Sequence, residues 1–100
     1  MHTLIFADAH SHLDQFEASE IPGVLQRAKE VGVNTVVVAG ITLQSSIDAI
    51  ALAEQNENIF AGIGIQPSDV TRRIDQGLYD QLKTVAQSSN KVVCISEVGL

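Results

Sequence analysis

Four short apolar runs alternate with three segments of helical periodicity, and this alternation constrains the fold more than any other feature. The runs at 4–7, 34–39, 59–64 and 91–96 predict β-strands. The order β-α-β-α-β-α-β predicts parallel strands joined by right-handed helical crossovers. Two α/β architectures fit this order: one half of a (β/α)8 barrel, or a small open doubly wound sheet.

The predicted helices carry start and stop signals. Ser19 is placed to cap a helix with Pro22 in its first turn, and Gly32 is placed to end that helix in a left-handed conformation. Thr42 is placed to cap the second helix. The apolar stripes that define the helices are Ile21, Val24, Leu25, Ala28 and Val31, then Leu43, Ile47, Ile50 and Ala51, then Leu78, Leu82, Val85 and Ala86.

Reactive polar side chains follow the predicted strands at their carboxyl ends. Asp8, His10 and His12 follow the first strand, Gln66 follows the third, and Glu97 follows the fourth. In both architectures functional groups collect at the carboxyl ends of parallel strands. We therefore expect a functional site at this edge of the sheet.

The two histidines are the first candidates for metal binding. Side chains alternate along an extended strand, so Asp8, His10 and His12 point the same way if the extended path continues through them. Neutral imidazole nitrogens bind zinc and the divalent metals of hydrolytic sites. The alternative is a pair of histidines in an ordinary polar loop, because His-x-His alone is a weak signal.

Composition limits the classes of function. The 100 residues are 45% apolar and 18% charged, which is typical of a globular domain. The net charge of -6 argues against a broad basic surface for nucleic acid, although bound cations can supply positive charge at a small site. Cys94 lies in an apolar run and is predicted to be a buried, inert thiol. No secretory signal or membrane-spanning run is visible in the sequence, so we expect a cytoplasmic protein.

Three further features are open to simple interpretations. Gly62 and Gly64 are not followed by Gly-Lys-Ser/Thr, which argues against a nucleotide P-loop. The pair Arg72-Arg73 is either a contact for a nucleic-acid phosphate or a solvated surface pair. His2 precedes the first strand and is predicted to be a surface residue.

Three segments together resemble the TatD family of metal-dependent deoxyribonucleases, which are (β/α)8 hydrolases related to the amidohydrolase superfamily. The segments are Asp8-Ala9-His10-Ser11-His12-Leu13-Asp14, Gly64-Ile65-Gln66-Pro67 and Ser96-Glu97-Val98-Gly99-Leu100. The resemblance implies that residues 1–100 form the amino-terminal half of such a barrel. It also implies that His10 and His12 bind a divalent metal (Mg, Mn or Zn), that Glu97 is a carboxylate ligand able to bridge two metals, and that Asp8 orders the loop beside them.

The activity implied by the resemblance is hydrolysis of DNA phosphodiester bonds by metal-activated water, with two metal ions in the full-length protein and Glu97 in a catalytic role. Two alternatives remain. One is an amidohydrolase-type enzyme that acts on C–N or ester bonds, and the other is a non-enzymatic α/β module with incidental histidines.

The chain departs from the family pattern after the third strand. Family members usually show Gly-Ile/Val-His-Pro-His, where this chain has Gly64-Ile65-Gln66-Pro67-Ser68. The amide of Gln66 can hydrogen-bond a phosphate or an ordered water, but it does not titrate near neutrality. Gln66 is therefore a candidate for substrate binding.

A second departure concerns length, because family members continue through four more strands that supply further metal ligands. We therefore expect the 100-residue chain alone to bind metal weakly and to be inactive or nearly so. We also expect it to self-associate through the open edges of its sheet. The side chains predicted to lose part of their cover are Leu4, Phe6, Val36, Val38 and Ile63.

Overall fold

The sheet of this protein contains four parallel strands that alternate with helices along the chain. The computed structural model describes residues 4–66 and 76–97. In chain order the elements are β1 (Phe6–Ser11), the short 3-10 helix η1 (Leu13–Gln15), α1 (Ile21–Glu30), β2 (Val33–Ala39), α2 (Leu43–Glu54), β3 (Ile59–Gly64), α3 (Gln76–Gln87) and β4 (Val92–Glu97). The predicted alternation of strands and helices is confirmed.

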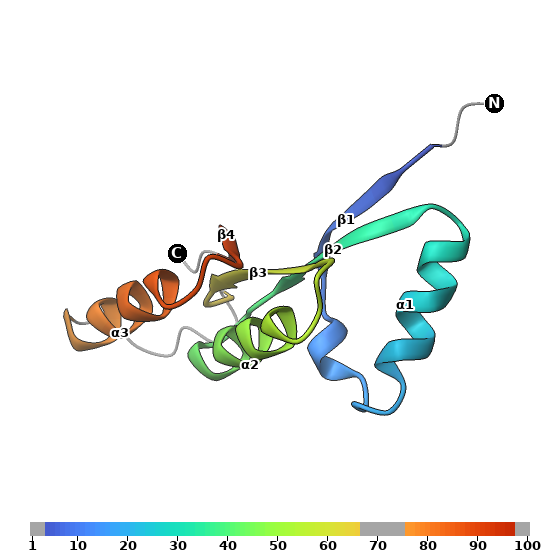
Figure 1. Ribbon diagram of the computed structural model, residues 1–100. Coiled ribbons are helices and arrows are strands. Elements are labelled where there is room, and N and C mark those ends of the chain that lie inside the picture. Colours follow the sequence, from blue (N-terminus) through green and yellow to red (C-terminus); the bar gives the residue numbers. More distant parts are fainter. Residues whose placement is uncertain (1–3, 67–75, 98–100) are drawn as a thin grey trace.

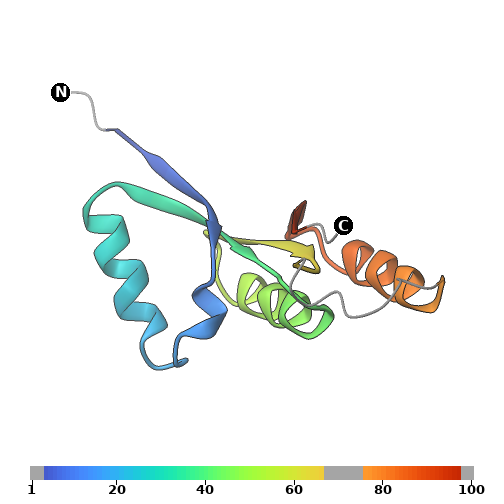
Figure 2. The same cartoon turned by 180° about the vertical axis from the view of Figure 1, so that it is seen from behind.

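Strand order and helix placement decide between the two architectures that fit the sequence. An open doubly wound sheet reverses its strand order at a switch point and carries helices on both faces. Here the order is β1-β2-β3-β4, every neighbouring pair is parallel, and the sheet curls. Figure 1 shows the helices gathered on one side of the sheet, and Figure 2 shows the same from behind. The architecture is therefore half of a (β/α)8 barrel.

The core lies between α2 and the two central strands. Ala49 and Ala53 on α2, Val38 on β2, and Ile59 and Ala61 on β3 are completely buried. The alanines keep the helix close to the sheet, while the β-branched residues fill the space over the strands. Strands β2 and β3 are therefore held in place by packing against α2, up to their carboxyl ends.

The end signals of two helices are confirmed. Thr42 caps α2 in a capping box: its hydroxyl accepts a hydrogen bond from the backbone N–H of Ser45, and the Ser45 hydroxyl accepts one from the N–H of Thr42. Gly32 follows α1 with a φ of 92°, the left-handed conformation that favours glycine. Across residues 4–66 and 76–97, none of the helices has the length and apolar character needed to cross a bilayer.

The predicted cap of α1 is wrong. The helix begins at Ile21, and its N-cap is Glu20, whose side chain makes no capping hydrogen bond, rather than Ser19. Pro22 lies in the first turn. Its fixed φ suits a helix and it has no N–H to satisfy, so the start of α1 needs less help from a cap.

Strand β1 is shifted toward the histidines relative to the predicted strand at 4–7. It spans Phe6–Ser11, with Asp8 opposite Val36 and Ser11 opposite Val38 on β2. Between these two pairs β1 has one residue more than β2, which breaks the simple alternation of side chains. His12 then leaves the strand with φ -118° and ψ 50° at the start of η1. The extended path does not continue through His12, so the condition for Asp8, His10 and His12 to point the same way is not met.

The edge strand β4 leaves its side chains open to solvent. Cys94 is exposed, so the prediction of a buried thiol is wrong. Its neighbours Val93 and Ile95 are 53% and 63% exposed. The apolar run predicts burial, but β4 is an edge strand that pairs with β3 alone within the described part of the chain. The helix that precedes it, α3, packs mainly against β3 rather than β4.

Of the five apolar side chains predicted to be partly exposed on the open sheet, two are exposed. Leu4 and Phe6 are largely exposed, as expected for the edge strand. Val36, Val38 and Ile63 are buried, so the prediction is wrong for these three. They belong to the central strands, which the helices cover.

Candidate metal centre

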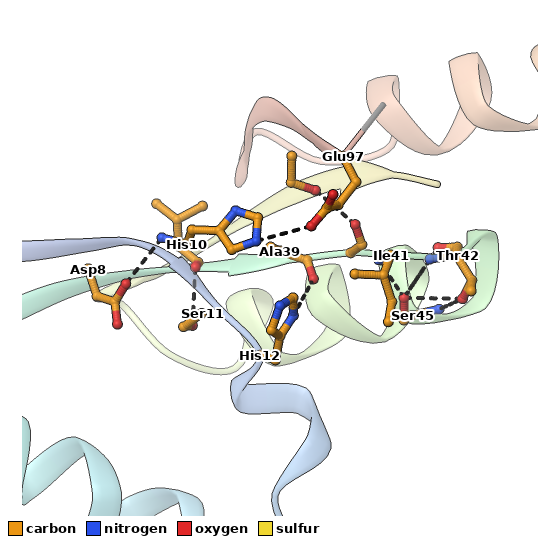
Figure 3. A network of polar contacts seen from close by, with 12 residues as sticks. Asp8, His10, Ser11, His12, Ala39, Ile41, Thr42, Ser45 and Glu97 are labelled. Atoms are coloured by element: carbon orange, nitrogen blue, oxygen red, sulfur yellow. Dashed lines mark hydrogen bonds and ion pairs between the residues drawn. The ribbon is translucent and has the colours of Figure 1, made fainter. Parts of the chain in front are cut away.

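Three potential metal ligands from the two edge strands come together at the carboxyl ends of the sheet. His10 is on β1, His12 follows β1, and Glu97 is the last residue of β4. One ligand atom from each lies within 4.8 Å of the others. The Nε2 atom of His10 is 3.2 Å from Oε1 of Glu97, and Figure 3 shows these two side chains pointing toward one another.

The two imidazole rings differ in their surroundings. Their centroids are 5.2 Å apart and their planes are nearly perpendicular, at 89°. The Nδ1 atom of His12 lies 3.2 Å from the carbonyl oxygen of Ala39 (Figure 3). A carbonyl can only accept, so Nδ1 donates this hydrogen bond and Nε2 becomes the available ligand atom of the ring. The end of β2 thereby sets both the tautomer and the orientation of His12.

Asp8 contacts the backbone of the histidine motif rather than a ring. Its Oδ1 accepts a hydrogen bond from the N–H of His10 at 3.1 Å. The carboxylate therefore ties down the backbone two residues away, where β1 departs from regular alternation. This placement fits a role in ordering the loop, and that role stays a prediction.

Gln66 lies directly after β3, at the same edge of the sheet as the histidines. Its backbone N–H donates a hydrogen bond of 2.8 Å to the carbonyl of Ile41, which follows β2. Its part in substrate binding stays a prediction. Ser68, Arg72 and Arg73 lie outside the described residues, as does His2.

A buried hydroxyl joins α2 to the end of β3. Ser46 is completely buried, donates a hydrogen bond to the carbonyl of Thr42 at 2.7 Å, and accepts one from the N–H of Gly64 at 3.1 Å. Gly64 lies opposite Glu97 in the sheet. The contact thus connects the core beneath α2 with the strand that neighbours the carboxylate.

Asp14, the last residue of the histidine motif, has a partly buried carboxyl close to the site. Burial raises the pKa of its carboxyl above the ordinary value, and the nearby Asp48 carboxylate adds to the shift. Its own backbone N–H and the neighbouring His12 act in the opposite direction. Within the part of the chain that the structure describes, its Oδ1 is buried without a hydrogen-bond partner. A charged Asp14 is therefore costly in this fold.

The donor set suits a divalent cation. Two imidazoles and one carboxylate match the ligands of zinc and of the metals in hydrolytic sites. The His10 side chain is 47% exposed and that of Glu97 is 24% exposed, so an ion has access from solvent. Three protein ligands also leave coordination positions for water or substrate. The ligand roles of these residues stay predictions.

Two groups beside the proposed ligands are not part of the predicted site: the carbonyl of Ala39 and the hydroxyl of Ser96. The Ala39 carbonyl that orients His12 is a backbone atom, and any residue type at this position would supply it. The Ser96 hydroxyl donates a hydrogen bond to the carbonyl of Gly40 at 2.9 Å. A small polar residue directly before a predicted ligand is the one hint that the sequence offers for Ser96.

The sequence is similar to that of known metal-dependent hydrolases. The sequence profile of the family described as TatD related DNase matches residues 7–100. The chain is 30% identical over 97 residues to "Uncharacterized metal-dependent hydrolase YjjV" of Escherichia coli (strain K12), covering 95% of this chain and 37% of that protein. It is 32% identical over 95 residues to "Uncharacterized metal-dependent hydrolase YabD" of Bacillus subtilis (strain 168), with 93% and 36% covered.

A third relative is "Uncharacterized metal-dependent hydrolase TatD" of Mycobacterium tuberculosis (strain ATCC 25618 / H37Rv), 27% identical over 96 residues, with 93% of this chain and 36% of that protein covered. The chain thus spans little more than a third of the length of these relatives. The family profile covers nearly all of the chain, and the fold is the half-barrel that the sequence resemblance implies. The chain therefore belongs to the TatD-related DNase family of metal-dependent hydrolases.

Proposed function

We propose that the whole protein hydrolyses phosphodiester bonds of DNA with the help of bound divalent metal ions. Family membership supports a metal-dependent hydrolase, and the relatives carry that description in their names. The observation that carries the proposal is the convergence of His10, His12 and Glu97 at the carboxyl ends of the strands. A nucleic-acid substrate is compatible with the net charge of -6, because bound cations provide the positive charge that the chain lacks.

Each of the three side chains has a distinct part in this proposal. His10 and His12 would hold one ion through their ring nitrogens, with the His12 ring oriented by the Ala39 carbonyl. Glu97 has two carboxylate oxygens, so it would hold the same ion and could also contribute to binding a second one. When bound, divalent ions make water more acidic and offset the charge that builds on the phosphoryl oxygens.

Gln66 is the proposed contact for the substrate phosphate. It follows β3 and shares the edge of the sheet with the three ligands. A neutral amide offers the same N–H donors and no charge at every pH, whereas a histidine gains a positive charge and a second donor when it is protonated at low pH. Replacing Gln66 by His should therefore make substrate binding more dependent on pH.

The test uses a hybrid in which residues 1–100 are followed by the remaining part of the Escherichia coli relative. The hybrid and its Glu97→Ala variant are loaded with Mn²⁺ and assayed on DNA, on an N-acyl amino acid and on a carboxylic ester. We expect cleavage of DNA, and its loss by about 100-fold or more in the variant. The isolated chain serves as a control and should have little or no activity.

The alternative classes predict different results. A folded, metal-loaded hybrid that hydrolyses the amide or the ester but leaves DNA intact would indicate an amidohydrolase-type enzyme. A hybrid that binds no metal, and in which Glu97→Ala changes nothing, would support a non-enzymatic module. Circular dichroism of each variant separates these outcomes from misfolding.

A further inference from the structure

An irregularity in β4 determines which way Glu97 faces. Ile95 pairs with Ile63 on β3, but the next residue of β3, Gly64, pairs with Glu97. Ser96 is therefore an extra residue in β4. In a regular strand Ile95 and Glu97 would share one face of the sheet. A bulge of this kind re-aims the side chain that follows it, and here that side chain is the carboxylate that meets His10.

The hydroxyl of Ser96 fixes this bulge to a strand that β4 does not pair with. Its Oγ donates a hydrogen bond of 2.9 Å to the carbonyl of Gly40, directly after β2. The strand order places β3 between β2 and β4, so the bond passes over β3. It does so at Gly62, where an added Cβ would lie 2.7 Å from Cβ and 3.2 Å from Oγ of Ser96. The contact therefore depends on the absence of a side chain at Gly62.

The same end of β2 holds a ligand from the other edge of the sheet. The carbonyl of Ala39 orients the His12 ring, and the carbonyl of the next residue, Gly40, holds Ser96. The N–H of Gly40 is itself fixed by the carbonyl of Gly62 at 2.9 Å. The carbonyls of two consecutive residues, Ala39 and Gly40, thus hold side chains from the two opposite edges of the sheet.

From this geometry we propose that Ser96 is a positioning residue that holds the Glu97 carboxylate toward His10 and His12. The role rests on the proposed metal site, but the geometry that it explains is present in the protein without metal. Removing the hydroxyl frees the bulge, so Glu97 spends less time facing the histidines. Metal affinity should fall although no ligand has been removed.

The experiment is a double-mutant cycle on the 100-residue chain, with Zn²⁺ affinity measured by isothermal titration. Ser96→Ala should weaken binding about tenfold, as expected for loss of a group that orients a ligand. In a Glu97→Ala background the same change should have no further effect, because Ser96 acts through Glu97. Ser88→Ala is the matched control, since it removes a hydroxyl that donates to the carbonyl of Val85 away from the site.

A structural role alone predicts a different pattern. It would weaken Zn²⁺ binding equally with and without Glu97, and that result, or unchanged affinity in Ser96→Ala, would overturn the proposal. Nuclear Overhauser effects between the His10 ring and the Glu97 side chain in the metal-free chain give an independent measure, and Ser96→Ala should weaken them. If the wild-type chain binds no Zn²⁺, the proposed function fails, and these effects alone decide on Ser96.

Discussion

The Nε2 atom of His10 and the Oε1 atom of Glu97 lie 3.2 Å apart, although their strands form opposite edges of the sheet. Neighbouring strands are about 4.8 Å apart, so three such steps would separate the two backbones by roughly 14 Å in a flat sheet. Contact is possible because the sheet curls and both side chains extend from the carboxyl ends of their strands. The candidate site is therefore a product of the barrel-like curvature, and it is sensitive to anything that flattens the sheet.

Close packing between β2 and α2 should make Gly40 intolerant of a side chain. A Cβ at Gly40 would collide with the hydroxyl of Ser46 and lie 2.7 Å from its Cα, which is anchored in the core. Gly40→Ala should lower the free energy of unfolding by about 1–3 kcal/mol, measured by urea denaturation. Gly23→Ala in α1 is the matched control, because its Cβ meets nothing closer than 3.4 Å and alanine favours a helix by about 0.5–1 kcal/mol. Equal effects of both changes would contradict this account.

The buried hydroxyl of Ser46 should stabilise the fold through the N–H of Gly64. Ser46→Ala leaves that buried N–H without its partner, which costs about 1–3 kcal/mol. Chemical denaturation measures the loss. Ser88→Ala, which removes an exposed hydroxyl, should change the unfolding free energy by less than about 0.5 kcal/mol. If Ser46→Ala were as mild as Ser88→Ala, the contact would not connect α2 to β3 as described.

The partly buried carboxyl of Asp14 should make stability depend on pH. Burial raises its folded pKa above the ordinary value of 3.8, so the folded state binds this proton more tightly than the unfolded state. The favourable contribution is present below pH 3.8 and is lost as the pH rises through the folded pKa. Asp14→Asn should therefore stabilise the chain at neutral pH and give no such gain in acid. Unfolding free energies measured from pH 3 to 7 in the presence of a chelator test this, and a gain that is the same at every pH would refute it.

Local sequence signals predict the elements of this fold well, and they predict tertiary surroundings less well. The helix of residues 43–54 follows from the Thr42 cap, which acts within a few residues. Its predicted apolar stripe is wrong in part, because Ile47 and Ala51 are exposed. The face buried against the sheet carries small side chains instead, those of Ser46, Ala49 and Ala53. The exposure of Cys94 does not follow, because an apolar run has the same composition in a covered strand and in an edge strand. Burial of such a run depends on which element lies over it, and that is decided by the rest of the fold.

The candidate site shows the same division. His10, His12 and Glu97 are placed together by the rule that parallel strands share their carboxyl edge, which the sequence order is sufficient to apply. The bulge at Ser96 and the role of the Ala39 carbonyl depend on register and backbone position. The Ala39 carbonyl has no residue-type signature, and a small polar residue before Glu97 only hints at the contact of Ser96. Both features therefore depend on the three-dimensional arrangement of the strands.

The exposed edges of the sheet should cause the 100-residue chain to self-associate in solution. Val93 and Ile95 on β4 are more than half exposed, and edge strands present backbone groups that can pair with another chain. We expect species larger than a monomer in sedimentation velocity. Ile95→Lys should shift the population toward monomer, whereas Tyr79→Lys on α3, which is 55% exposed, should not. A wild-type chain that sediments as a monomer at high concentration would contradict this prediction.

The proposed cation site at the curled edge of the sheet is tested most directly by titrating Zn²⁺ into the 100-residue chain and into its His10→Ala/His12→Ala variant. Isothermal titration should show one ion per wild-type chain, bound weakly because the chain supplies only part of the expected ligand set. The variant should bind more than about 100-fold more weakly, because losing two ligands costs more than losing a group that merely orients one. Binding of equal strength by both proteins would show that the imidazoles hold no ion, and the metal centre proposed for this chain would be wrong.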